Sequence, residues 1–122
     1  LDGGHNPAAG KAIAAHFSKL KPRPTYAICG MLNTKDVKGF LKPLAPQIDK
    51  LFGISIPGET NTLTGEETSQ AAKNVGIESD FSDTVELALE IIMKYSEKPR
   101  IIICGSLYLA GHILTLHEYE IK

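Results

Sequence analysis

Residues 100–107, RIIICGSL, decide the fold class of this chain. Isoleucines and a cysteine run without polar interruption from residue 101 to residue 104, and a glycine and a serine follow them. Continuous apolar runs of this length are typical of strands that are buried on both faces, as in parallel sheets covered by helices. Residues 25–31, TYAICGM, show the same pattern, so a second buried strand is predicted there.

A helix is predicted before the strand at residues 25–31. Asn6 followed by Pro7 is typical of a helix N-cap and first turn. The apolar stripe of this helix consists of Ile13, Phe17 and Leu20. The segment KPRP, residues 21–24, ends the helix because proline disrupts a helix interior.

A second helix is predicted over residues 37–48, where apolar residues recur at helical spacing. These residues are Val37, Leu41, Leu44 and Ile48. Pro43 lies inside the segment and is expected to kink the helix, because a proline removes one backbone hydrogen bond.

The centre of the chain continues the alternation of strand and helix. Residues 50–56, KLFGISI, predict the next strand. Thr64 and Glu67 have the spacing of a capping box, which begins a helix that we expect to end near Gly76. Residues 76–79, GIES, predict a brief strand.

Two further helices flank residues 100–107. Ser82 is expected to cap the helix before this strand. The buried positions of that helix are predicted to be Val85, Ala88, Leu89 and Ile92. A last helix is expected after the strand, with an apolar stripe of Leu109, Ile113 and Leu116.

This order of elements predicts an α/β fold. Parallel strands need crossover connections, and helices supply these connections while they cover the sheet. We therefore predict a single domain over residues 1–122, with a Rossmann-like, mostly parallel sheet of about five or six strands and helices on both faces. A composition of 43% hydrophobic and 22% charged residues agrees with one globular domain.

Charge, hydropathy and cysteine spacing exclude several classes of partner. Thirteen Lys plus Arg against fourteen Asp plus Glu give a formal net charge of −1, so neither nucleic acid nor an anionic membrane is expected as a partner. Apolar runs fall far short of the roughly 20 residues that span a bilayer, and no signal-peptide pattern opens the chain, which predicts a cytoplasmic location. Cys29 and Cys104 are expected to be buried thiols, and no ligand spacing predicts a protein-built metal site.

Three segments are expected at the edge of the sheet where ligands bind. In open parallel sheets that edge lies beyond the carboxyl ends of the strands. The segments are DGGHNP at residues 2–7, CGMLNTKD at residues 29–36 and CGSLYLAG at residues 104–111. Each is read as a turn between a strand and a helix, with glycine residues that let a ligand approach the backbone.

The first segment has the side chains of a nucleotide site. Asp2 stands at a strand tip, where a carboxylate accepts hydrogen bonds from ribose hydroxyls but repels phosphate. His5 adds a titratable nitrogen, and Pro7 opens a helix whose free N–H groups point back at the turn. The alternative is that Asp2 and Asn6 are turn and cap residues and that His5 is a solvated loop residue.

The other two segments offer fewer polar candidates. Ser106 and nearby free N–H groups could hold a carboxylate, and the alternative is an ordinary N-cap serine. Lys35 and Asp36 start the second predicted helix, where each is either a ligand contact or a solvated charge.

Two glycine-rich stretches resemble phosphate-binding loops and are rejected. GISIPGET, residues 53–60, has Glu59 where a P-loop needs lysine, so it would repel phosphate. GGHNPAAG, residues 3–10, is not the GxGxxG pattern of dinucleotide-binding enzymes. No GxSxG motif surrounds Ser106, which excludes the hydrolase elbow.

Taken together, LDGGHNPAAG, GMLNTKD and CGSLYLAGHIL resemble the C-terminal domain of the folylpolyglutamate synthase/dihydrofolate synthase family, a branch of the Mur-type ATP-dependent amide ligases. The resemblance extends over the whole chain in order and spacing. HNP is shared with the Mur cell-wall ligases, whereas GSLYLAG points to the folate branch.

The resemblance implies an ATP-dependent acid–amino-acid ligase divided between two domains. Its substrates are ATP, L-glutamate and either dihydropteroate or tetrahydrofolate, and the reaction proceeds through an acyl phosphate. An N-terminal domain carries the P-loop and the Mg²⁺ ligands in this family. That domain is absent from the present chain, so the chain alone is expected to be inactive.

The resemblance also implies roles for individual residues. Asp2 corresponds to the aspartate that binds the ATP ribose, and Asn6 belongs to the same ATP-binding motif. His5 corresponds to a catalytic histidine near both the nucleotide and the incoming glutamate, and Ser106 to a serine that helps to hold the glutamate. Two alternatives stay open: a Mur cell-wall ligase domain, and a stand-alone nucleotide-binding module.

Overall fold

A computed structural model describes residues 7–33, 36–105 and 120–121 of the chain. Its helices are α1 (Pro7–Ser18), α2 (Val37–Leu41), α3 (Gly65–Asn74) and α4 (Val85–Tyr95), with a 3₁₀ helix η1 (Lys42–Gln47) directly after α2. Its strands are β1 (Thr25–Gly30), β2 (Lys50–Gly53), β3 (Ser79–Phe81), β4 (Arg100–Gly105) and β5 (Glu120–Ile121).

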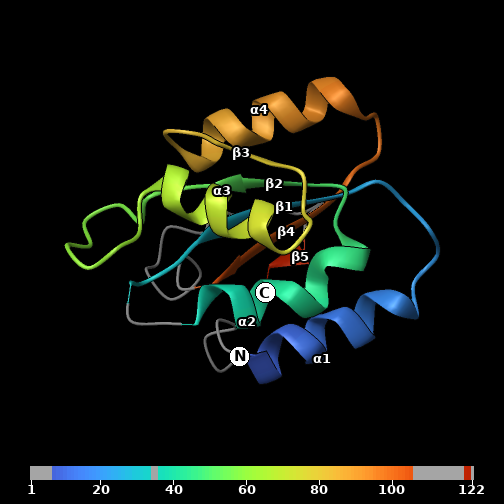
Figure 1. Ribbon diagram of the computed structural model, residues 1–122. Coiled ribbons are helices and arrows are strands. Elements are labelled where there is room, and N and C mark those ends of the chain that lie inside the picture. The colour runs from blue at the N-terminus through green and yellow to red at the C-terminus, as the bar shows by residue number, and fades with distance from the viewer. Residues whose placement is uncertain (1–6, 34–35, 106–119, 122) are drawn as a thin grey trace.

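The strands form one parallel sheet with the order β3-β2-β1-β4-β5 (Figure 1). The two segments that predicted buried strands, β1 and β4, lie side by side near the centre. Their pairing runs in register from Thr25 and Arg100 to Gly30 and Gly105. The predicted α/β fold with a parallel sheet is thereby confirmed, and the described residues contribute five strands, of which β5 was not predicted.

Successive residues of the central strands enter two separate cores. Ala27 and Cys29 pack with α1, α2, η1 and α3, whereas Ile28 packs with α4. Figure 1 shows α1 and α4 on opposite faces of the sheet. β4 alternates in the same way, with Ile102 on the first side and Ile103 on the second. Alternate side chains point to opposite faces of a strand, so a continuous apolar run is needed to fill both cores.

The predicted second helix changes type instead of kinking. It is α-helical only over α2 and continues as the 3₁₀ helix η1, with Pro43 near the start and Pro46 inside. Proline has no N–H to donate to the carbonyl four residues earlier, and the tighter 3₁₀ form tolerates this interruption. The predicted apolar positions all lie in the core: Val37, Leu41, Leu44 and Ile48.

Of the N-caps predicted for α3 and α4, the structure confirms the first and contradicts the second. The Thr64–Glu67 capping box is confirmed, because Thr64 Oγ1 accepts from Glu67 N at 3.1 Å and Glu67 Oε1 accepts from Thr64 N at 2.8 Å. The prediction that Ser82 caps α4 is wrong. Thr84 is the cap: its hydroxyl accepts from Leu87 N at 3.1 Å, because Thr84 has the extended backbone that places it one turn from that donor.

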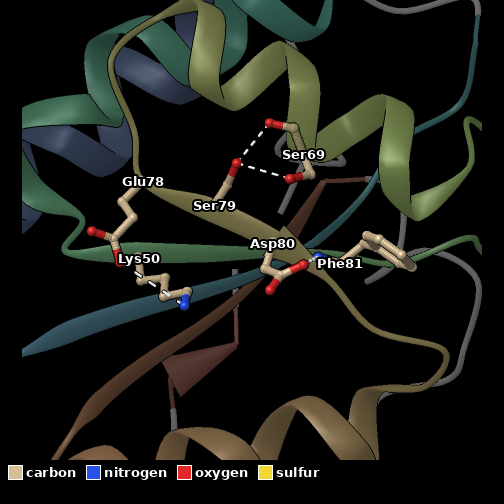
Figure 2. A network of polar contacts seen from close by, with 6 residues as sticks. All are labelled: Lys50, Ser69, Glu78, Ser79, Asp80 and Phe81. Carbon is tan, nitrogen blue, oxygen red and sulfur yellow. Dashed lines mark hydrogen bonds and ion pairs between the residues drawn. The ribbon is translucent and has the colours of Figure 1, made fainter.

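The strand that was predicted at residues 76–79 lies slightly later, at β3. Gly76 adopts a left-handed backbone with φ of 89° and ends α3, so the chain reaches the sheet only after this turn. Ser79, the first residue of β3, donates its hydroxyl to the carbonyl oxygen of Ser69 at 2.7 Å (Figure 2). The two hydroxyls lie 2.9 Å apart, so buried hydrogen bonds fix this edge strand to α3.

β2 and α3 are in backbone contact through Gly53 and Gly65. A Cβ atom on Gly65 would lie 2.6 Å from the carbonyl oxygen of Gly53. A Cβ atom on Gly53 would collide with the carbonyl oxygen of Gly65 and lie 3.0 Å from the backbone nitrogen of Ser69. Glycine at both positions therefore sets how closely α3 covers the sheet.

We expect Gly53→Ala to lower the free energy of unfolding by about 3 kcal/mol, because α3 must shift to admit the methyl group. Urea denaturation measures this loss. Gly58→Ala is the matched control: nothing lies within 4 Å of the added methyl group, and only the φ of 76° is unfavourable, which costs about 1 kcal/mol. A smaller loss at Gly53 than at Gly58 would contradict this close contact.

Candidate functional site

The central strands β1 and β4 end together at the carboxyl edge of the sheet. Cys29 pairs with Cys104, and Gly30 pairs with Gly105, which is the last residue of β4. The second and third segments that the sequence singled out therefore leave the sheet from adjacent positions. Because both strands end in glycine, no side chain of Gly30 or Gly105 stands between this edge and a ligand.

Helix α1 begins toward the same edge. Gly10, in its first turns, packs so closely on α2 that a Cβ atom would collide with the carbonyl oxygen of Phe40. Near its other end, the ring of Phe17 lies 5.5 Å from the guanidinium carbon of Arg100, the first residue of β4. The helix thus runs antiparallel to the strands, and Pro7 lies toward their carboxyl ends (Figure 1).

This arrangement brings the described parts of the three candidate segments to one edge. The first N–H groups of a helix have no intrahelical partner, and the helix dipole makes that end attractive to anions. The edge accordingly combines a helix start at Pro7 with two glycine-terminated strands. Backbone donors and accessible strand ends are suited to phosphate or carboxylate groups.

The chain between β2 and α3 lies beside the end of β1 and is hydrogen-bonded to the residues that follow this strand. Asn33 N donates to Asn61 O at 2.7 Å, and Leu63 N donates to Met31 O at 2.9 Å. Thr62 Oγ1 also accepts from Ile56 N at 2.8 Å. This bridge was not predicted, because no local pattern of the sequence indicates antiparallel pairing between distant segments.

The structure places one of the predicted site residues. Asp36 is exposed and caps α2, where its Oδ1 accepts from Gly39 N at 2.9 Å. One carboxylate oxygen is thus used by the helix, and a ligand contact by Asp36 stays a prediction. The other predicted site residues lie outside the described residues: Asp2, His5, Asn6, Lys35 and Ser106. The predicted last helix with Leu109, Ile113 and Leu116 lies outside them as well.

Cys29 and Cys104 are buried and free, as predicted. They lie on paired positions of β1 and β4 and contribute to the core shared with α1 and α2. A hydrogen bond with Cys104, burial and the charge of the neighbouring thiol together raise the pKa of Cys29 well above its usual value. Cys29 is therefore a protonated core residue at neutral pH rather than a nucleophile.

Two further features concern the described residues alone. Within residues 7–33, 36–105 and 120–121, no three His, Cys, Asp or Glu side chains gather in a way that could hold a metal ion. In the same part of the chain, no helix has the length and apolar character needed to cross a membrane.

Comparison with known proteins gives consistent matches. Residues 1–116 match the family described as dihydrofolate synthetase, C-terminal domain. The dihydrofolate synthase/folylpolyglutamate synthase of Haemophilus influenzae is 33% identical over 103 residues, which cover 77% of this chain. The chain spans 23% of that relative's length.

Solved structures share the fold. Mycobacterium tuberculosis folylpolyglutamate synthase complexed with ADP and AMPPCP superposes with a TM-score of 0.79 at 24% identity, over 91% of this chain and 27% of that one. A bifunctional folylpolyglutamate synthase/dihydrofolate synthase with Mn, AMPPNP and L-glutamate bound gives a TM-score of 0.74 at 24% identity. That match covers 92% of this chain and 27% of the solved one.

The raised pKa of Cys29 predicts a loss of stability in alkali. Below the usual thiol value of 9.0, Cys29 is protonated in both the folded and the unfolded chain and contributes no pH dependence. Above it, the unfolded chain releases a proton that the folded chain retains, so the free energy of unfolding falls by up to about 1.4 kcal/mol per pH unit. Urea denaturation between pH 8 and pH 10.5 measures this slope.

Cys29→Ala should make that slope shallower, because it removes the titrating thiol. Val37→Ala is the control: it truncates another buried side chain of the same core without a titrating group, so it should lower stability equally at every pH. Equal slopes for wild type and Cys29→Ala would contradict the raised pKa.

Proposed function

Because the chain belongs to the family of dihydrofolate synthetase C-terminal domains, we propose that it is the C-terminal domain of an ATP-dependent ligase that joins L-glutamate to dihydropteroate or to a folate. The observation that carries this proposal is the convergence of Pro7, Gly30 and Gly105 at one edge of the sheet. Helix starts and strand ends of this kind bind anionic groups, and both ATP and glutamate carry them.

The proposed division of labour follows from the length of the chain. It spans 23% of its Haemophilus relative, and the P-loop pattern that would hold ATP phosphates is absent from its sequence. We assign the P-loop, the Mg²⁺ ligands and the pterin pocket to a preceding ATPase domain. The present chain would then close over the nucleotide and contribute to the glutamate site, as domains do when a site is completed by closure.

The reaction forms one amide bond and breaks one phosphoanhydride bond of ATP. The carboxylate of the pterin substrate takes the γ-phosphoryl group of ATP and becomes an acyl phosphate, and ADP leaves. The amine of L-glutamate attacks the carbonyl carbon, and phosphate leaves. The contribution of this chain is to bind and orient both reactants at the carboxyl edge, and phosphoryl transfer depends mainly on such positioning.

Four of the predicted site residues have a role in this scheme. Asp2 accepts hydrogen bonds from the ribose, and Asn6 supports the same ATP-binding turn. His5 lies at the junction of nucleotide and glutamate, and Ser106 donates to the glutamate α-carboxylate. The nucleotides and the L-glutamate named for the two solved relatives support nucleotide and glutamate as the ligands of this scheme.

Asp2→Ala in the whole enzyme should raise the KM for ATP by roughly 10-fold to 100-fold, because a charged hydrogen-bond acceptor contributes about 1.5–3 kcal/mol. Steady-state kinetics with ATP and with L-glutamate as the varied substrate measure the two KM values separately. The KM for glutamate should change much less. Asp2→Asn, which keeps an acceptor oxygen, should lie between wild type and Asp2→Ala, and an unchanged KM for ATP would remove Asp2 from the nucleotide site.

Ser106→Ala should have the opposite selectivity. Loss of a hydroxyl that donates to a buried carboxylate weakens glutamate use by about 1–3 kcal/mol. The KM for ATP should stay close to that of the wild type, so each variant is a control for the other. Normal saturation by glutamate in Ser106→Ala would contradict the assigned role.

A further inference from the structure

An open cavity of about 340 Å³ lies at the amino edge of the sheet, opposite to the strand ends discussed above. It is bounded by the end of α1, by the linker at residues 21–24 and by the first residues of β1 and β4. Residues near the end of η1 close the remaining side. The cavity is therefore built from segments that are distant in sequence and held together by the central strands.

The lining of this cavity is strongly basic. Lys21, Arg23 and Arg100 line it together with a single carboxylate, that of Asp49. The chain as a whole has a formal net charge of −1, so the excess of positive charge is local. A concave surface with charges of one sign concentrates ligands of the opposite sign.

Two contacts hold Arg100 within the described part of the chain, and only one of its N–H donors has a hydrogen-bond partner there. Its Nη2 donates to Lys21 O at 3.1 Å, and its guanidinium carbon lies 5.5 Å from the centroid of the Phe17 ring. A guanidinium has N–H donors arranged for bidentate contact with carboxylate or phosphate. A fixed guanidinium loses little conformational entropy when it binds an anion in this way.

Arg23 is the second arginine of the cavity, and its backbone, rather than its side chain, is restricted. It stands between Pro22 and Pro24, whose rings restrict the backbone on both sides. Within the described part of the chain, neither Arg23 nor Arg100 forms an ion pair. The positive charge of Arg23 is thus presented on a stiff segment without a neutralising partner there.

The single carboxylate of the cavity already has a structural partner. Asp49 Oδ2 accepts from Thr25 N at 2.8 Å, and Asp49 N donates to Thr25 O at 2.8 Å. This pair joins the start of β1 to the residue before β2. Asp49 therefore has a structural role in the sheet, and its single negative charge offsets only part of the three positive charges of the lining.

We propose that this cavity binds a small oxyanion, either a phosphate ester or a dicarboxylate, between Arg23 and Arg100. Both ligand types present paired anionic oxygens that suit guanidinium donors. The site is separate from the proposed nucleotide and glutamate site, because the two occupy opposite edges of the sheet. Its existence does not depend on the proposed function.

Titration of the ¹⁵N-labelled chain with inorganic phosphate and, separately, with glutarate tests the proposal. At low ionic strength we expect saturable amide shifts at residues 18–21, 23, 25, 47–49 and 100, with a Kd on the order of 1 mM for at least one probe. The probe that binds more tightly identifies the ligand type. Higher ionic strength should weaken the interaction. Shifts that fail to saturate with both probes, or that fall mainly outside these residues, would overturn the proposal.

Arg23→Gln should weaken binding by at least about fivefold, because it removes a charge-assisted contact. Arg23 is exposed, and its side chain forms no hydrogen bond or ion pair within the described residues, so this variant should fold normally. Lys94→Gln is the matched control, since it removes one positive charge from exposed α4, outside the cavity lining. This control should change the Kd less than twofold. An equal loss of affinity in both variants would show that only the net charge matters and would overturn the proposed site.

Discussion

The parallel pairing of β1 with β4 is the constraint on which the rest of the structure depends. It joins residues that are about seventy-five positions apart in the chain and runs in register over six pairs, from Thr25 and Arg100 to Gly30 and Gly105. Both strands are buried on both faces beyond their first residues, so the apolar side chains of each strand belong to one core or the other. A slip by one residue would exchange the two sets of side chains between the cores, which makes the register energetically well defined.

Backbone contacts of glycine residues determine how closely the helices cover this central pair. Gly10 lets α1 pack against the backbone of α2, and Gly53 with Gly65 lets α3 approach β2. Such contacts exclude any larger side chain, so they fix the positions of helices rather than merely permitting them. The start of α1 consequently has one position relative to the ends of β1 and β4, and this position creates the candidate site.

The sequence predicted those parts of the structure that depend on local chemistry. Continuous apolar runs located β1 and β4, and the Thr64–Glu67 pair located the start of α3 because both partners lie within one turn. The change to a 3₁₀ helix at Pro43 and the choice of Thr84 over Ser82 were missed. Each depends on backbone geometry that several residues set together, and residue type alone does not determine it.

The candidate site was predictable for a different reason. The rule that ligands bind at the carboxyl ends of parallel strands selected the segments that contain Gly30 and Gly105, and the observed pairing places these two residues side by side. Strand order, which the sequence analysis did not assign, was needed to establish this adjacency. The bridge between residues 31–33 and 61–63 could not be predicted, because its partners share no motif and meet only through the sheet.

The two edges of this sheet, at which we propose anion sites, would attract anions by different physical means. A helix that runs antiparallel to the strands presents its free N–H groups at the carboxyl edge and its free carbonyl groups at the amino edge. Anion binding at the carboxyl edge can therefore use the backbone, whereas at the amino edge the helix dipole opposes it. Arg100 donates one hydrogen bond to the carbonyl oxygen of Lys21, beyond the end of α1. The positive charges of Arg100 and Arg23 would supply the attraction for an anion that the helix end does not. The polarity of a parallel sheet thus accounts for why one site has glycine residues and the other arginine residues.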